Sequence, residues 1–237
     1  MGLDIYVGSL TRYHTRNWQT ILQQLGPQAG LTVKVVRVGE PANQKTPDPK
    51  VVRAAVEKWR SGIAQALKQP LAWSESDDTP YFTDKPNWSA FGAVHLLAAY
   101  LEHPSEKMPE TLPGGWQQDK VLLACKAAAT AKNTGTRYAQ LYFPEFWFPA
   151  SFPFVFKTNY VTQNEMSFGS APALLAILRQ INDHAFGASR EEVRQWRKGE
   201  SAGGGTPFQS SAKFGLSILM ELAEQSTLHQ LPMKLDY

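Results

Sequence analysis

Residues 90–101 form an apolar stretch that only His95 interrupts, and this stretch limits the folds open to the chain. With its neighbours it predicts a helix over residues 88–102, capped by Asn87 and ended by Pro104. Such a helix is apolar nearly all round, so other elements must cover it on every side. It is too short for a bilayer, which takes about 20 apolar residues. We therefore expect a central core helix and no membrane span.

The rest of the chain is apolar enough to bury that helix. It has 237 residues, of which 43% are hydrophobic and 19% are charged. At about 100–200 residues per domain, this length allows one large domain or two small ones. We find no internal repeat and no long linker, and therefore expect residues 1–237 to form a single globular domain. The net charge is only +3 and no long basic run is present, which argues against nucleic-acid binding.

The spacing of apolar residues predicts a helix-dominated α+β domain with a small β-sheet. The clearest amphipathic helix covers residues 51–67, with Asp48 as its N-cap. Alternation predicts strands over residues 3–7 and 31–38, and residues 231–237 form a short strand or an extended tail. If the strands near the two ends pair, they make a small sheet beside a helical body. Further helices are expected over residues 18–25, 117–132, 171–186, 189–198 and 211–225.

Residues 142–156 hold a dense group of aromatic side chains. Pro144, Pro149 and Pro153 interrupt them, which argues against a central strand and favours an edge strand or an extended loop. The segment either covers the core or forms an exposed binding face. Core cover is favoured, because so much apolar area in water promotes aggregation. Glu145 lies among these rings, and burial would raise its pKa as it does in some catalytic acids.

The residues that usually carry catalysis or bind metals form no recognisable pattern. No pair of histidines has the short spacing of zinc ligands, and we expect His95 to be a core histidine. Cys125 is the single cysteine and lies on an apolar helix face, so a buried thiol is favoured over a nucleophile. A lone cysteine fits a reducing compartment, and residues 1–10 lack the pattern of a signal peptide. We predict a cytoplasmic protein without catalytic residues, metal or cofactor.

Three consecutive glycines, Gly203, Gly204 and Gly205, precede Thr206 and the last predicted helix. Their backbone N–H groups could face an anion such as phosphate. A flexible loop is the favoured interpretation, because no strand precedes the glycines and no Gly-Lys-Ser/Thr sequence follows them.

The loop over residues 73–84 is the most suggestive segment for function. It combines four carboxylates with aromatic residues, and carboxylate pairs can bind a hard cation or perform acid–base chemistry. The same composition suits an interface, where aromatic residues fill pockets and acidic residues attract a basic partner. A solvated loop held down by two of its aromatic residues is the plainer alternative. The residues concerned are Trp73, Glu75, Asp77, Asp78, Tyr81 and Asp84.

Three segments of the chain resemble a group of uncharacterised bacterial cytoplasmic proteins. They are residues 1–13 (MGLDIYVGSLTRY), residues 81–88 (YFTDKPNW) and residues 231–237 (LPMKLDY). Some members of that group look like the immunity proteins that accompany secreted toxins. The resemblance implies a binding role, in which such a protein neutralises a toxin by covering or plugging its active site. It implies no chemistry and no functional residue.

Together these observations predict a non-enzymatic, cytoplasmic protein-binding module, with an immunity protein that binds a cognate toxin as its specific form. The expected partner is a protein, and neither nucleic acid nor a membrane is expected. The loop over residues 73–84, with the six residues named above, would form the interface. The alternative is a small-molecule enzyme of hydrolase type, in which carboxylates of residues 75–84 act with a histidine that folding brings close.

Overall fold

One mixed sheet organises the part of the chain that the computed structural model describes, residues 3–33, 46–130, 135–198 and 207–237. Its six strands lie in the order β2-β1-β6-β3-β5-β4. All pairs are antiparallel except β3 with β5. The strands are β1 (Asp4–Val7), β2 (Phe82–Asp84), β3 (Phe146–Phe148), β4 (Phe156–Asn159), β5 (Glu165–Ser170) and β6 (Met233–Asp236).

The two ends of the chain meet inside this sheet, as we expected from their strand patterns. β1 lies between β2 and β6, and its Tyr6 is paired with Lys234 of β6. Side chains alternate across a strand, so Tyr6 and Lys234 share one face of the sheet while Ile5 and Leu235 share the other. The predicted strand over residues 3–7 and the strand alternative for residues 231–237 are confirmed.

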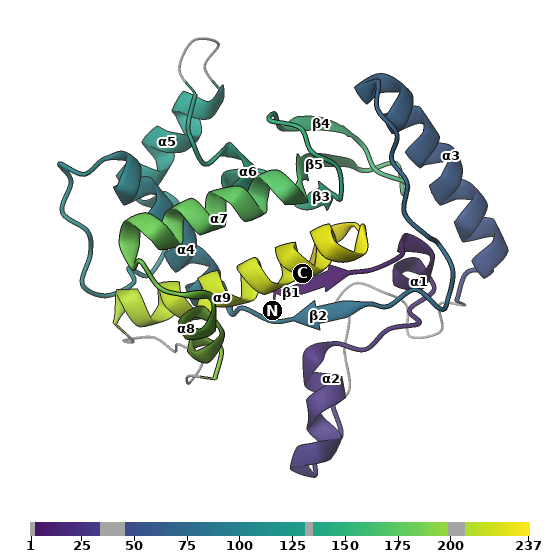
Figure 1. Ribbon diagram of the computed structural model, residues 1–237, viewed down its shortest axis with the longest axis horizontal. Helices are drawn as coiled ribbons and strands as arrows, with labels where there is room; N and C mark the ends of the chain where they lie inside the picture. Colours follow the sequence, from purple (N-terminus) through teal and green to yellow (C-terminus); the bar gives the residue numbers. More distant parts are fainter. Residues whose placement is uncertain (1–2, 34–45, 131–134, 199–206) are drawn as a thin grey trace.

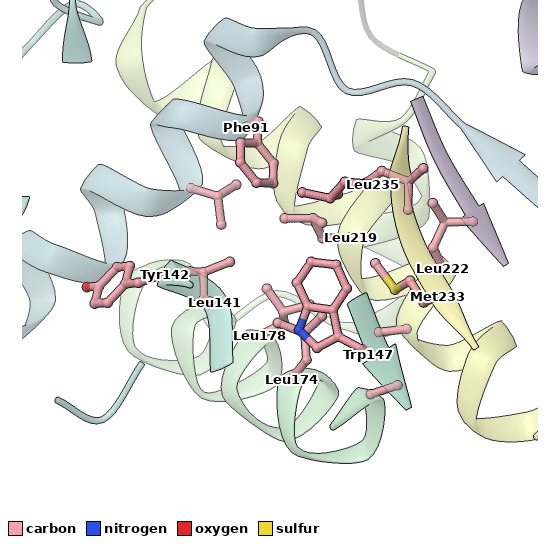
Figure 2. Close-up of a cluster of buried hydrophobic side chains, with 14 of the residues drawn as sticks. Phe91, Leu141, Tyr142, Trp147, Leu174, Leu178, Leu219, Leu222, Met233 and Leu235 are labelled. Carbon is pink, nitrogen blue, oxygen red and sulfur yellow. The ribbon is translucent and has the colours of Figure 1, made fainter. Parts of the chain in front are cut away.

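Helices cover the face of the sheet that carries Leu235. The main ones are α4 (Trp88–Glu102), α7 (Ala171–Ala185) and α9 (Phe208–His229), which pack on one another. α4 is buried along most of its length and is capped by Asn87, so the predicted central helix is confirmed. Figure 2 shows the interior of this layer, where Trp147 of β3 projects among leucines of α7 and α9.

The opposite face of the sheet is covered by α3 (Pro49–Leu67) and α1 (Leu10–His14). α3 is the predicted amphipathic helix, and Asp48 caps it by accepting a hydrogen bond from the Lys50 backbone. It stands apart from α4, α7 and α9 (Figure 1). Its Trp59 packs against rings on the sheet, with centroid distances of 5.4–5.9 Å to Phe146, Phe148, Tyr160 and Phe168.

The prediction that prolines exclude residues 142–156 from the middle of the sheet is wrong for β3. This strand lies between β6 and β5, because Pro144 and Pro149 fall just outside it and remove no donor from its ladder. The predicted core cover is confirmed, since β3 is wholly buried. Gln140 helps to hold the segment: its amide donates to Phe154 O at 2.8 Å, and its backbone oxygen accepts from Trp147 Nε1 at 2.8 Å.

The strand predicted over residues 31–38 is not found in the part of it that can be described. No regular structure is found at residues 31–33, and the rest of the predicted strand over residues 31–38 lies outside the described residues, as do Gly203 to Gly205.

None of the described helices is long and apolar enough to cross a membrane. The fold is the expected helix-dominated α+β domain with a small sheet. The remaining helices are α2 (Ile21–Leu25), η1 (Gly26–Ala29), η2 (Trp116–Gln118), α5 (Lys120–Thr130), α6 (Ala139–Tyr142) and α8 (Arg190–Trp196).

Candidate functional site

The predicted interface loop is anchored inside the protein by Glu75. Its buried carboxylate accepts hydrogen bonds from the backbone N–H groups of Leu10 (3.2 Å) and Thr11 (2.6 Å) and from Trp73 Nε1 (2.5 Å). These backbone groups begin α1, whose first N–H groups have no partner within the helix. Glu75 therefore caps α1 from a distant part of the chain, and its acceptor atoms face inward.

Trp73 is equally inaccessible to a partner. Its side chain is only 6% exposed and packs against Phe148 on the sheet, with ring centroids 6.0 Å apart. The guanidinium of Arg60 lies over the indole at 4.9 Å and donates to the Trp73 carbonyl oxygen at 2.5 Å. Trp73 thus joins the loop to α3 and to the sheet, which is the role of a core residue.

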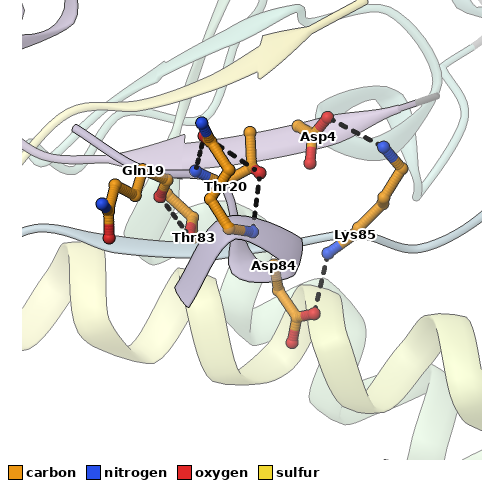
Figure 3. A network of polar contacts seen from close by, with 7 residues as sticks. Asp4, Gln19, Thr20, Thr83, Asp84 and Lys85 are labelled. Carbon is orange, nitrogen blue, oxygen red and sulfur yellow. Dashed lines mark hydrogen bonds and ion pairs between the residues drawn. The ribbon is translucent and has the colours of Figure 1, made fainter. Parts of the chain in front are cut away.

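Asp84 is also buried, at the end of β2. It forms an ion pair with Arg197 and accepts from the Lys85 backbone N–H at 2.7 Å. Burial raises the pKa of Asp84, and the nearby Arg197 lowers it in part. Figure 3 shows Lys85 next to it, with its ammonium 3.1 Å from the Asp4 carboxylate. This end of β2 is therefore held by two charge pairs.

Asp77 and Asp78 are the two loop carboxylates that face solvent, and Tyr81 is half-buried. Arg12 of α1 holds this turn in place. Its guanidinium lies over the Tyr81 ring at 4.9 Å and donates to the carbonyl oxygens of Thr79 (3.2 Å) and Asp77. The tip of the loop is accordingly fixed in position while its two carboxylates remain accessible.

The short helix α2 adjoins this turn and exposes leucines. The backbone N–H of Gln19 lies 3.4 Å from the Tyr81 hydroxyl, and Thr83 Oγ1 donates to the Gln19 carbonyl at 3.2 Å (Figure 3). Leu22 and Leu25 of α2 are 47% and 50% exposed, and Leu31, which follows η1, is 61% exposed. We call the surface made by Asp77, Asp78, Tyr81, Leu22, Leu25 and Leu31 the acid–leucine surface.

The enzyme alternative requires a histidine beside two carboxylates of the loop. Glu75 instead binds the backbone of α1, and Asp84 binds Arg197. Among the described residues, no group of three or more His, Cys, Asp and Glu side chains could hold a metal ion. His95 is a buried core histidine, as predicted, and burial lowers its pKa to about 4. Cys125 is buried too, and burial raises its pKa to about 12.

A pocket of about 530 Å³ lies beside the end of α1, and sequence reasoning missed it. The end of α1, the first half of α3, the turn between β4 and β5, and β6 all contribute to its lining. Its polar wall includes Tyr13, His14, Arg16, Tyr160 and Lys234. These residues come from three distant parts of the chain, so no local motif could have indicated them.

Hydrogen bonds fix the polar wall of this pocket. Lys234 Nζ donates to Tyr13 Oη at 3.0 Å and to the Leu235 carbonyl at 2.7 Å, and Tyr13 Oη donates to Asp236 Oδ1 at 2.5 Å. His14 Nε2 lies 2.9 Å from the Tyr160 hydroxyl. Burial, with a contribution from Lys234, lowers the pKa of His14 to about 4, so its ring is neutral near pH 7.

The comparisons with known proteins assign neither surface. No known protein family matches the sequence, and the comparisons with curated proteins and with solved structures find no match. The functional argument therefore rests on the geometry of the acid–leucine surface and of the pocket.

Proposed function

We propose that this protein is a non-enzymatic protein-binding module, and that the acid–leucine surface is where its partner docks. The observation that carries the proposal is α2, a helix that projects from the body of the molecule (Figure 1) and buries none of its own residues. Its core-forming role is therefore small. A projecting helix with exposed leucines is a common means of protein recognition.

The local structure keeps α2 formed without help from a core. Thr20 and Gln23 make a reciprocal capping box, in which each side chain binds the other residue's backbone N–H. The Gln24 amide also donates to Thr83 Oγ1 at 3.1 Å, which ties the helix to β2. A preformed helix loses less conformational entropy when it binds, and this supports a docking role for α2.

The surface chemistry suggests the kind of partner. Leu22, Leu25 and Leu31 favour an apolar groove, and the carboxylates of Asp77 and Asp78 favour basic side chains beside it. Because of the resemblance to immunity proteins, the first partner to test is a toxin domain, which would be bound in the cytoplasm. Trp73, Glu75 and Asp84 then serve to hold the loop in place rather than to contact the partner.

The experiment begins with capture of the tagged protein from its native cells and identification of a stoichiometric partner, including a direct test of the neighbouring gene's product. Affinity is then measured by calorimetry with the purified partner. The double variant Leu22→Ser, Leu25→Ser should weaken the complex by roughly 100-fold, since each leucine loses its apolar contact area. Loss of toxicity on binding would identify the protein as an immunity protein.

The matched control is Leu123→Ser, which changes an exposed leucine on α5, away from α2 (Figure 1). It should leave affinity unchanged. Unchanged affinity of the Leu22 and Leu25 double variant would exclude the acid–leucine surface, and recovery of the protein without a stoichiometric partner would count against a binding module altogether.

A further inference from the structure

The pocket beside α1 has a second wall that is apolar. It is made by Val51, Val52 and Ala55 of α3, together with Val161 of the turn between β4 and β5 and Met166 of β5. Val51 is 66% exposed, so this wall extends to the protein surface. The volume of about 530 Å³ falls within the range of roughly 300–1,000 Å³ that is usual for small-molecule sites.

The polar wall carries positive charge. Among the described residues that line the pocket, Arg16 and Lys234 are cations and none is a carboxylate. The Tyr13 hydroxyl accepts a hydrogen bond from Lys234 and donates one to the Asp236 carboxylate, which does not itself line the pocket. Lys234 is buried and its ammonium is directed by two hydrogen bonds, so it offers a fixed positive charge at low solvent exposure.

The uncharged polar groups of the pocket are compatible with a negatively charged ligand. His14 and Tyr160 form a hydrogen-bonded pair at 2.9 Å on the pocket wall, and the neutral imidazole adds no competing charge. Tyr13 is held between Lys234 and Asp236, so its ring has one orientation. A charged wall and an apolar wall that meet in one cavity select for a ligand with both characters.

We propose that this pocket binds a small amphipathic anion, with a carboxylate or phosphate head group against Arg16 and Lys234 and an apolar tail along Val51, Val52 and Met166. This function is separate from protein docking, because the acid–leucine surface contributes no residue to the pocket. The two proposals can therefore fail independently.

Met166 supplies a direct readout. It is one of five methionines in the chain and lines the pocket, as none of the other described methionines does, so NMR of protein labelled at the methionine methyl carbons reports on this site. Decanoate or decyl phosphate should shift the Met166 methyl signal saturably, with a Kd below about 1 mM. Decanol, which has the same tail without a charge, should bind at least tenfold more weakly.

Two variants test the charged wall, and one tests the apolar wall. Arg16→Gln and Lys234→Met should each weaken decanoate binding by roughly tenfold. Val51→Asp, which places a carboxylate at the apolar rim, should do the same. Lys107→Gln is the control, because Lys107 is 88% exposed and does not line the pocket. Arg16 and Val51 are exposed, so their variants remain informative if the buried Lys234 proves necessary for folding.

Three results would overturn the proposal. Equal binding of decanol and decanoate would show a purely apolar cavity. The absence of a saturable Met166 shift with both anions would show that the cavity binds neither. Unchanged affinity in Arg16→Gln and Val51→Asp would place any anion site elsewhere.

Discussion

The two faces of the sheet are built from different chemistry. Towards α4, α7 and α9 the strands present apolar side chains such as Ile5, Trp147 and Leu235, which the helices bury completely or nearly so. Towards α1 and α3 the same strands present Tyr6 and Lys234, with aromatic rings beside them on the neighbouring strands. One face is therefore a dry core, and the other combines packing with buried polar groups.

The helix side therefore mainly stabilises the fold, whereas the side covered by α1 and α3 also forms the walls of the candidate binding regions. Apolar contacts on the helix side need no exact partner, whereas each polar group on the α1 and α3 side needs a directed hydrogen bond. The bonds of Glu75, Tyr13 and Lys234 meet that need and also fix the walls of the pocket and the base of the loop. Both candidate binding regions consequently adjoin the polar side of the molecule.

The largest effect is expected from the helix side. Trp147→Ala removes a fully buried indole and leaves the Gln140 carbonyl oxygen without its donor, so the free energy of unfolding should fall by about 3–5 kcal/mol. Urea unfolding followed by circular dichroism measures this loss. A loss of unfolding free energy below about 1 kcal/mol would mean that the helix side of the sheet is not a tightly packed core.

A smaller loss is expected on the polar side. Glu75→Ala leaves three buried donors, on Leu10, Thr11 and Trp73, without their acceptor, and should lower the free energy of unfolding by about 2–4 kcal/mol. Glu165→Ala, at an exposed carboxylate on β5, is the matched control and should stay within about 0.5 kcal/mol. If Glu75→Ala folded as stably as this control, the carboxylate would not be a structural cap.

The pH dependence of stability compares one histidine from each side. Unfolded His95 takes up a proton as pH falls through about 6.5, but burial lowers its pKa to about 4 in the folded protein. Its contribution to stability is therefore present above pH 6.5 and is lost between about pH 6.5 and 4, with a slope of at most about 1.4 kcal/mol per pH unit. His95→Gln should remove that slope from urea unfolding curves.

His14→Gln should flatten the same curves by a similar amount. The pKa of His14 is also lowered to about 4, first by burial and then by the nearby Lys234, so protonation opposes folding over the same pH range. A clearly smaller effect at His14 than at His95 would show that the pocket lets water reach the charged imidazole of His14.

Sequence reasoning was correct where short-range rules decide the structure. The N-caps Asp48 and Asn87 and the apolar pattern of α4 depend on neighbours within a turn or two, and all were predicted. β3 was misplaced because its burial depends on strands far away in the sequence. His14 and Tyr160 are 146 residues apart, so their pairing could not be seen before the fold was known.

The loop over residues 73–84 shows the same limit of local rules within one segment. Composition singled this loop out as a candidate interface, but composition cannot separate a carboxylate that caps a distant helix from one that faces solvent. Glu75 and Asp77 are two residues apart and have opposite environments, because only Glu75 faces the start of α1. The orientation of a loop side chain follows from tertiary contacts, which local patterns do not contain.

The smallest effect on stability, and a clear one on binding, is expected at the tip of this loop. Asp77→Asn with Asp78→Asn changes two exposed carboxylates, so the free energy of unfolding should stay within about 0.5 kcal/mol of the parent protein. Loss of two charges facing a basic partner should slow association by roughly tenfold at low salt, and added salt should abolish the difference. Stopped-flow binding at two ionic strengths measures this. Equal rates at low salt would mean that these carboxylates lie outside the interface, and the leucines of α2 would then be its only supported part.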